Sequence, residues 1–150
     1  MVIGIFGESC TGKSTLAQKI AQRISCDIYT SKDYLRLAKN ESDAKAMFQK
    51  KLENSVNGEN IIYVISEMEH MSFLPHKSIR ILVTADLNLI KSRFAQRMHG
   101  NLPAPVAAML EKKHGCFDGE PCDLHVITEK TDIDVICEEI VNLIKKPVCV

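Results

Sequence analysis

The stretch GESCTGKST, residues 7–15, constrains the fold more than any other part of this chain. Glycine, four residues, glycine, lysine and serine is the spacing of a phosphate-binding loop, in which backbone N–H groups converge on phosphates at a helix N-terminus. The context agrees, because the apolar run VIGIF (2–6) precedes the loop and an amphipathic segment with Leu16, Ala17 and Ile20 follows it. In such a loop Lys13 bridges the terminal phosphates and the Ser14 hydroxyl lies on Mg²⁺. The predicted nucleotide-binding residues are Gly7, Glu8, Ser9, Cys10, Thr11, Gly12, Lys13, Ser14 and Thr15.

Short apolar runs alternate with amphipathic segments along the whole chain, a pattern typical of a parallel sheet covered by helices on both faces. The predicted strands are 2–6, 26–30, 61–66, 79–84 and 124–128. We expect helices after the loop, twice within 31–60, after Asp86, up to Gly115 and from about Thr131. The caps of the two helices within 31–60 are predicted to be Ser31 and Ser42. A chain of 150 residues with this pattern is predicted to be one α/β domain, 1–150.

Charge and composition narrow the classes of partner. Lysine and arginine (19) balance aspartate and glutamate (19), so no bulk field favours nucleic acid or an anionic membrane. No apolar run approaches the roughly 20 residues that a membrane helix needs, and MVIGIFG lacks the features of an export signal. The six scattered cysteines are expected to be reduced thiols. These features together predict a cytoplasmic protein without a nucleic-acid or membrane partner.

Two classes of phosphate-loop protein fit poorly. A GTPase needs DxxG and NKxD after particular strands, and only EKTD (129–132) faintly matches the second motif. A mechanical ATPase ends an apolar strand in an acidic pair, whereas the third predicted strand runs into VISEMEH, where Glu67 imitates that acid only in part.

The remaining pattern resembles the small phosphate-loop kinases, such as cytidylate, adenylate and shikimate kinases, over nearly the whole chain in element order. Three places carry the resemblance, namely GESCTGKST, SKDYLR (31–36) and RFAQR (93–97), and CDLHVIT (122–128) is similar to the fifth strand of the cytidylate kinases. The resemblance implies a three-layer α/β/α fold with five parallel strands in the order 2-3-1-4-5. It also implies acceptor-side helices in 31–58 and a short lid at about 91–104.

The same resemblance implies ATP and Mg²⁺ as cofactors and phosphoryl transfer to a small-molecule acceptor, with a nucleoside or nucleotide as the leading class. Arg93 and Arg97 would close over the donor phosphates, and Asp33 and Arg36 would address the acceptor. The catalytic set is Lys13, Asp33, Arg93 and Arg97, and the metal set is Ser14, Asp33 and Glu67. In the plainer interpretation, these arginines are solvated helix residues and Asp33 is an acid in a first helical turn.

Two alternatives stay open at this stage. EMEHMSF follows the third strand in place of the GGG or DGR signatures of these kinases, which favours a nucleotide-binding regulatory ATPase or sensor without an acceptor. The quartet His114, Cys116, Cys122 and His125 raises the question of a zinc site. Its spacing is not one that zinc sites use, and His125 would lie in a buried strand, so we expect these side chains to be unliganded.

Overall fold

The computed structural model describes residues 1–145 and contains a five-stranded parallel sheet in the order β2-β3-β1-β4-β5, as predicted. The strands are β1 (Val2–Phe6), β2 (Asp27–Thr30), β3 (Ile61–Ile65), β4 (Ile79–Thr84) and β5 (Leu124–Ile127). The α-helices are α1 (Lys13–Arg23), α2 (Glu41–Ser55), α3 (Leu87–Arg97), α4 (Ala104–Lys113) and α5 (Ile133–Lys145). Three 3-10 helices complete the chain, η1 (Asp33–Leu37), η2 (Met68–Phe73) and η3 (Thr128–Lys130).

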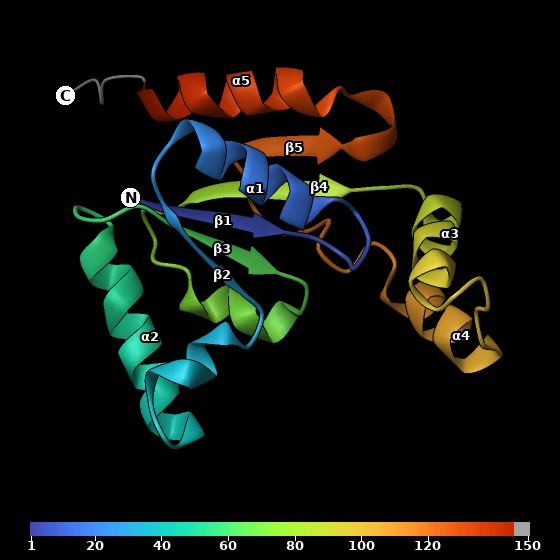
Figure 1. Cartoon of the computed structure of the whole chain (residues 1–150), viewed down its shortest axis with the longest axis horizontal. Helices are drawn as coiled ribbons and strands as arrows, with labels where there is room; N and C mark the ends of the chain where they lie inside the picture. Colours follow the sequence, from blue (N-terminus) through green and yellow to red (C-terminus); the bar gives the residue numbers. More distant parts are fainter. Residues whose placement is uncertain (146–150) are drawn as a thin grey trace.

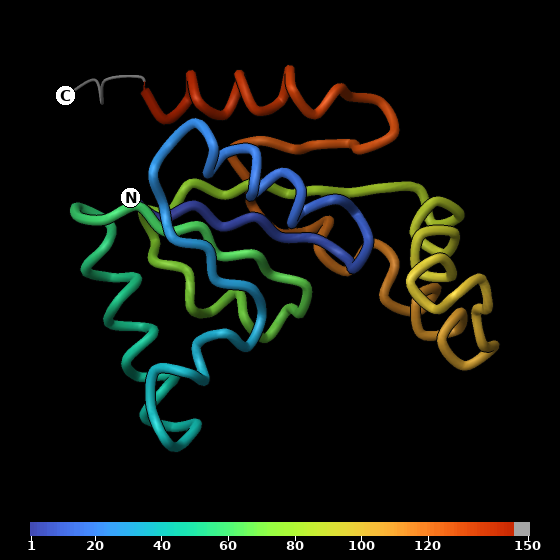
Figure 2. The backbone as a smooth tube through the Cα atoms, viewed as in Figure 1, coloured from blue at the N-terminus to red at the C-terminus, as the bar shows by residue number. Residues whose placement is uncertain are grey.

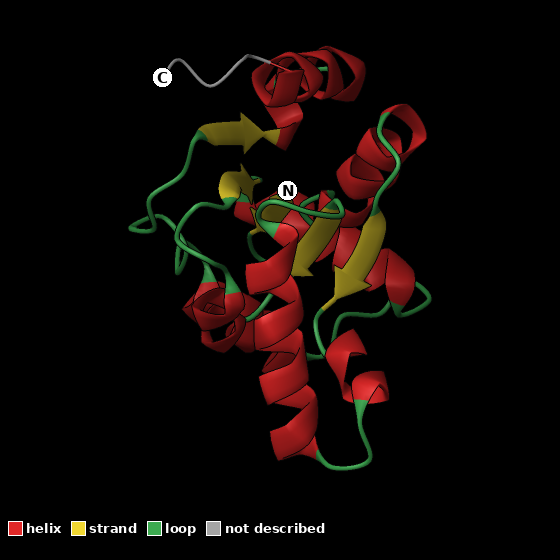
Figure 3. Ribbon diagram, turned by 90° about the vertical axis from the view of Figure 1, so that its left-hand side faces the viewer, coloured by secondary structure: helices red, strands yellow, loops and turns green. Residues whose placement is uncertain are grey.

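Helices cover both faces of the sheet, which gives three layers (Figures 1 and 3). Every residue of β1 and β3 is buried, and alternate side chains of these strands enter opposite layers. Ile3, Ile5 and Val64 pack with α1 and α5 on one face. Phe6 and Tyr63 pack with α2, η1 and η2 on the other. This two-sided burial explains why the central strands read as continuous apolar runs.

The carboxyl ends of the strands meet at one edge of the sheet, where the loop after β1 turns into α1. Helices α3 and α4 pack against each other beyond this edge, joined by the short connection 98–103 (Figure 2). Asp86 caps α3 as expected, its carboxylate accepting from the Asn88 backbone N–H at 3.1 Å. The fold therefore gathers the chain turns that follow all five strands on one side of the molecule.

The two predicted caps within 31–60 are wrong. Ser31 takes a left-handed backbone conformation (φ 49°) at the end of β2, and the helix that follows is a 3-10 helix starting at Asp33. Asn40 caps α2, since its side-chain oxygen accepts from the Asp43 N–H at 2.8 Å, and Ser42 lies inside the helix. Asn40 is preferred because it stands one residue before the first helical turn in an extended conformation, where its side chain can reach the exposed N–H groups.

Other properties of the described residues are quickly stated. Across residues 1–145, none of the helices combines the length and the apolar character needed to cross a membrane. Cys10, Cys26, Cys116, Cys122 and Cys137 are free thiols, and Cys149 lies outside the described residues.

Candidate active site

The loop between β1 and α1 has the backbone of an anion cradle. Gly12 has a φ of 97°, and a Cβ on Gly7 would lie 2.1 Å from the backbone oxygen of Val83, so neither position accepts a side chain without a shift. Within residues 1–145, no hydrogen bond is donated by the backbone N–H groups of residues 8–15. Eight consecutive N–H groups at the start of a helix are thus available to an anion.

A cavity of about 180 Å³ lies over this loop. Its lining residues are Ser9, Cys10, Gly12, Lys13, Ser14, Thr15, Thr30, Val64, Ser66 and Arg97. Arg97 comes from the end of α3, and one turn earlier Arg93 donates from Nη1 to the backbone oxygen of Cys10 at 3.1 Å. The structure therefore brings both predicted lid arginines to the phosphate loop, one lining its cavity and one fixing its main chain.

Lys13 is buried in this cavity wall, with 5% of its surface exposed. Its Nζ donates to the backbone oxygen of Glu8 and, at 3.4 Å, to Thr11 Oγ1. Burial lowers the pKa of Lys13 to about 8, and the positive charge of Arg97 adds to this, while Cys10 and Glu8 act in the opposite direction. The ammonium therefore lacks a strong counter-charge, and a bound phosphate would supply one.

The acceptor-side residues are not all brought together. Asp33 Oδ2 accepts from the Thr30 N–H at 2.8 Å, which holds its carboxylate at the end of β2, beside a residue that lines the phosphate cavity. The Arg36 guanidinium instead lies 4.8 Å from the centre of the Tyr29 ring and does not line the phosphate cavity. The expectation that Asp33 and Arg36 face one cleft is not met, because the 3-10 geometry of η1 gives the two side chains different neighbours.

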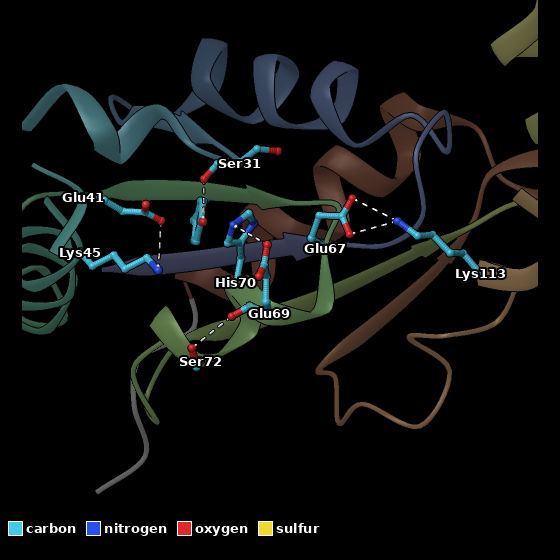
Figure 4. Close-up of polar contacts among 9 residues, drawn as sticks. Ser31, Glu41, Lys45, Glu67, Glu69, His70, Ser72 and Lys113 are labelled. Atoms are coloured by element: carbon cyan, nitrogen blue, oxygen red, sulfur yellow. Dashed lines mark hydrogen bonds and ion pairs between the residues drawn. The ribbon is translucent and has the colours of Figure 1, made fainter. Parts of the chain in front are cut away.

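Of the three predicted metal ligands, Ser14 lines the phosphate cavity and the two acids do not. Both carboxylate oxygens of Glu67 accept from Lys113 Nζ, at 3.2 and 3.3 Å, which joins the end of β3 to the end of α4 (Figure 4). Ser14 and Asp33, which is held at the neighbouring strand end, are the residues best placed to hold Mg²⁺ near the loop.

The histidines and cysteines between 114 and 125 have other neighbours than one another. His114 Nδ1 lies 3.0 Å from Glu8 Oε1, and His125 Nε2 lies 2.8 Å from Thr84 Oγ1. His125 is exposed, contrary to the prediction, because β5 is an edge strand and its alternate residues face outward. Residues 1–145 contain no group of three or more His, Cys, Asp or Glu side chains able to hold a metal ion.

Two contacts of the phosphate loop were not predicted. Besides the His114–Glu8 contact, the Thr128 hydroxyl donates to the backbone oxygens of Thr11 (2.6 Å) and Thr84 (3.0 Å). The partners lie 106 and 117 residues apart in the chain. No local pattern signals such contacts, although the position of Thr128 directly after the last strand places it at the correct edge of the sheet.

A second, larger cavity of about 540 Å³ opens between η1, α2 and η2. Its lining residues are Lys32, Tyr34, Glu41, Lys45, Ala46, Gln49, Glu69, His70, Ser72 and Phe73. Figure 4 shows the polar side chains of this region, with Glu41 paired to Lys45 and Glu69 beside His70. We call it the η2 cavity.

Comparison with known proteins identifies the fold. No protein family model and no curated protein matches the sequence. Among solved structures, an uncharacterized protein from Eubacterium ventriosum is similar over 98% of this chain and 99% of its own, with a TM-score of 0.71 and 18% identity. A shikimate kinase from Acinetobacter baumannii, solved with shikimate, is similar over 95% and 92% (TM-score 0.65, 14% identity). A gluconokinase from Sinorhizobium meliloti is similar over 92% and 87% (TM-score 0.59, 14% identity).

Proposed function

Because the chain has the fold of the small phosphate-loop kinases, we propose that it transfers a phosphoryl group from ATP, with Mg²⁺, to a small-molecule acceptor. The observation that carries the proposal is the phosphate loop itself. Its N–H groups from residue 8 to residue 15 have no acceptor within residues 1–145, and they surround a cavity that holds a buried, unneutralised lysine. Such a loop costs stability without an anion and gains it with one.

Each residue of the site has a role that follows from its position. Lys13 and Arg97 line the cavity and would neutralise charge on the transferring group, while Arg93 holds the Cys10 carbonyl and so the shape of the loop. Mg²⁺, when bound, would bridge donor phosphates, held by Ser14 and the carboxylate of Asp33. Asp33, fixed by the Thr30 N–H, would also orient or deprotonate the acceptor hydroxyl.

The neighbours named as kinases support transfer to a small molecule, since shikimate kinase and gluconokinase share this fold over more than nine-tenths of the chain. One observation favours the second candidate, a regulatory nucleotide-binding module. Arg36 is turned onto Tyr29 and Glu67 is paired with Lys113, so two predicted site residues are engaged elsewhere. Acceptor-dependent release of ADP separates the two candidates.

The test begins with binding of ATP and Mg²⁺ measured by calorimetry. Lys13→Ala should weaken binding strongly, because a charge on the terminal phosphates is lost while the backbone cradle stays. Lys39→Ala is the matched control, since Lys39 is exposed and lines neither cavity. Equal affinities for the wild type and Lys13→Ala would refute nucleotide binding by this loop. ADP release is then followed with a panel of nucleosides, nucleotides, sugars and sugar acids, and no acceptor-dependent release would favour the regulatory module.

A further inference from the structure

The η2 cavity contains a buried polar atom that lacks a partner. His70 is 3% exposed, and its Nδ1 makes no hydrogen bond to any residue in 1–145. Its other ring nitrogen, Nε2, lies 3.7 Å from Glu69 Oε1, and its ring packs edge-on against Tyr34. Buried polar groups are rarely left without a partner, so an orphaned nitrogen in the wall of a cavity indicates a ligand that supplies one.

The η2 cavity lies next to the phosphate cavity along the strand ends. Thr30 lines the phosphate cavity and Lys32, two residues later, lines the η2 cavity. Ser66 and Glu69 repeat this arrangement after β3. Between the cavities, the Tyr63 hydroxyl donates to the backbone oxygen of Ser31 at 2.8 Å, which fixes the chain that separates them (Figure 4). A molecule in the η2 cavity would therefore sit beside the donor phosphates.

The lining of the η2 cavity indicates which molecules it would take. Its aromatic side chains, Tyr34 and Phe73, are at most 7% exposed and pack on each other with ring centres 5.0 Å apart. They offer no open ring face on which a nucleobase could stack. The groups that remain for a ligand are hydrogen-bonding ones from Lys32, Gln49, Ser72 and His70.

We propose that the η2 cavity binds a small polyhydroxylated molecule, a sugar, cyclitol or sugar acid, and that His70 Nδ1 hydrogen-bonds one of its hydroxyls. The inference rests on the proposed function in one respect, since this molecule would be the phosphoryl acceptor. It departs from the nucleoside or nucleotide that the sequence favours. An acidic group on the ligand would find its counter-charge in Lys32, which has no ion-pair partner among the described residues.

Binding is measured directly by calorimetry, without ATP, so that the result does not depend on turnover. The probes are gluconate, shikimate, glucose and myo-inositol, with uridine and adenosine as the contrasting set. His70→Phe keeps the ring volume and removes the nitrogen, whereas His70→Asn keeps a polar atom near the position of Nδ1. His76→Phe makes the same change at an exposed histidine that lines neither cavity, and serves as the matched control.

We expect at least one polyol to bind and neither nucleoside to do so. His70→Phe should weaken that binding about tenfold or more, His70→Asn should restore part of it, and His76→Phe should not change it. The melting temperature of His70→Phe should equal or exceed that of the wild type, because an unpaired buried nitrogen is removed. If it fell sharply, His70→Asn alone would decide, and binding as weak in His70→Asn as in His70→Phe would overturn the proposal.

Three other outcomes would also overturn it: no binding by any polyol, binding of nucleosides alone, or equal affinity in His70→Phe and the wild type. The proposed function is tested separately. Turnover of a polyol with an unchanged KM in His70→Phe would refute the role of His70 and leave the kinase intact. His70-dependent binding without any ADP release would support the η2 cavity and refute phosphoryl transfer.

Discussion

Replacing Lys13 by methionine should make the protein more stable without nucleotide, although it removes the central charge of the site. The pKa of the buried ammonium falls from its ordinary 10.5 to about 8, chiefly through burial. That difference means that keeping the charge inside costs roughly 3 kcal/mol at pH 7. The two hydrogen bonds of Nζ offset part of this, at about 1 kcal/mol each. Since the Glu8 carbonyl still accepts from the Thr11 hydroxyl at 2.9 Å, no acceptor is stranded in the variant.

The net expectation is that Lys13→Met stabilises the protein by about 1–2 kcal/mol at pH 7. The sign of the pH dependence follows from the lowered pKa. Between about pH 8 and pH 10.5 the unfolded chain holds a proton on Lys13 that the folded protein has released, so wild-type stability rises with pH across this window. By pH 10 the cost of the buried charge falls to roughly 1 kcal/mol, so the advantage of the variant should shrink by about 2 kcal/mol.

Urea unfolding followed by far-ultraviolet circular dichroism at pH 7, 8, 9 and 10 measures both effects, a suitable probe because the chain has no tryptophan. Only the difference between variant and wild type is interpreted, so that cysteine and tyrosine titrations cancel. Lys39→Met, at an exposed position, is the control and should show no such pH-dependent difference. A Lys13→Met variant that is less stable than the wild type at pH 7, or a difference that stays flat to pH 10, would refute the reasoning.

Three further predictions concern the same edge of the sheet. Asp33→Asn should lower acceptor turnover by about 10²–10⁴ with nearly unchanged ATP affinity, measured by steady-state kinetics and calorimetry, because the amide keeps the shape but loses the basic charge; full turnover would leave Glu67 as the acid to test. Gly7→Ala should lower the melting temperature and weaken ATP binding together, since its methyl group would meet the Val83 carbonyl at 2.1 Å, and normal binding would contradict the rigid cradle. Chelator treatment should leave the melting temperature unchanged, and a loss that zinc restores would revive a metal site in 114–125.

The sequence predicted the architecture well because the signals that specify it are local. The phosphate-loop spacing, the apolar runs of β1 and β3, and the Asp86 cap each depend on residues a few positions apart, and burial of the strands on both faces made their order recoverable from the family pattern. Cap placement failed where two candidates stood close together, as with Asn40 and Ser42. There the backbone conformation of one residue decides which side chain reaches the helix end.

The candidate site was predictable in part, and the limit is physical. Ser14 and Arg97 follow from position in the loop and in the helix after β4. The orientation of Arg36 does not, because the attraction of a guanidinium to the Tyr29 ring competes with a cleft on nearly equal terms. His70 was invisible in the sequence, since an orphaned nitrogen is defined by what surrounds it in space.

The Thr128 hydroxyl has a single hydrogen, and the structure places it within reach of two acceptors, the carbonyls of Thr11 and Thr84. One of these belongs to the phosphate loop and the other to the end of β4. If the loop moves when phosphates enter, the hydrogen can pass from one carbonyl to the other without ever being unpaired. The loop thus has a built-in tolerance for displacement, and serine would retain it at this position, whereas valine, of nearly the same shape, would not.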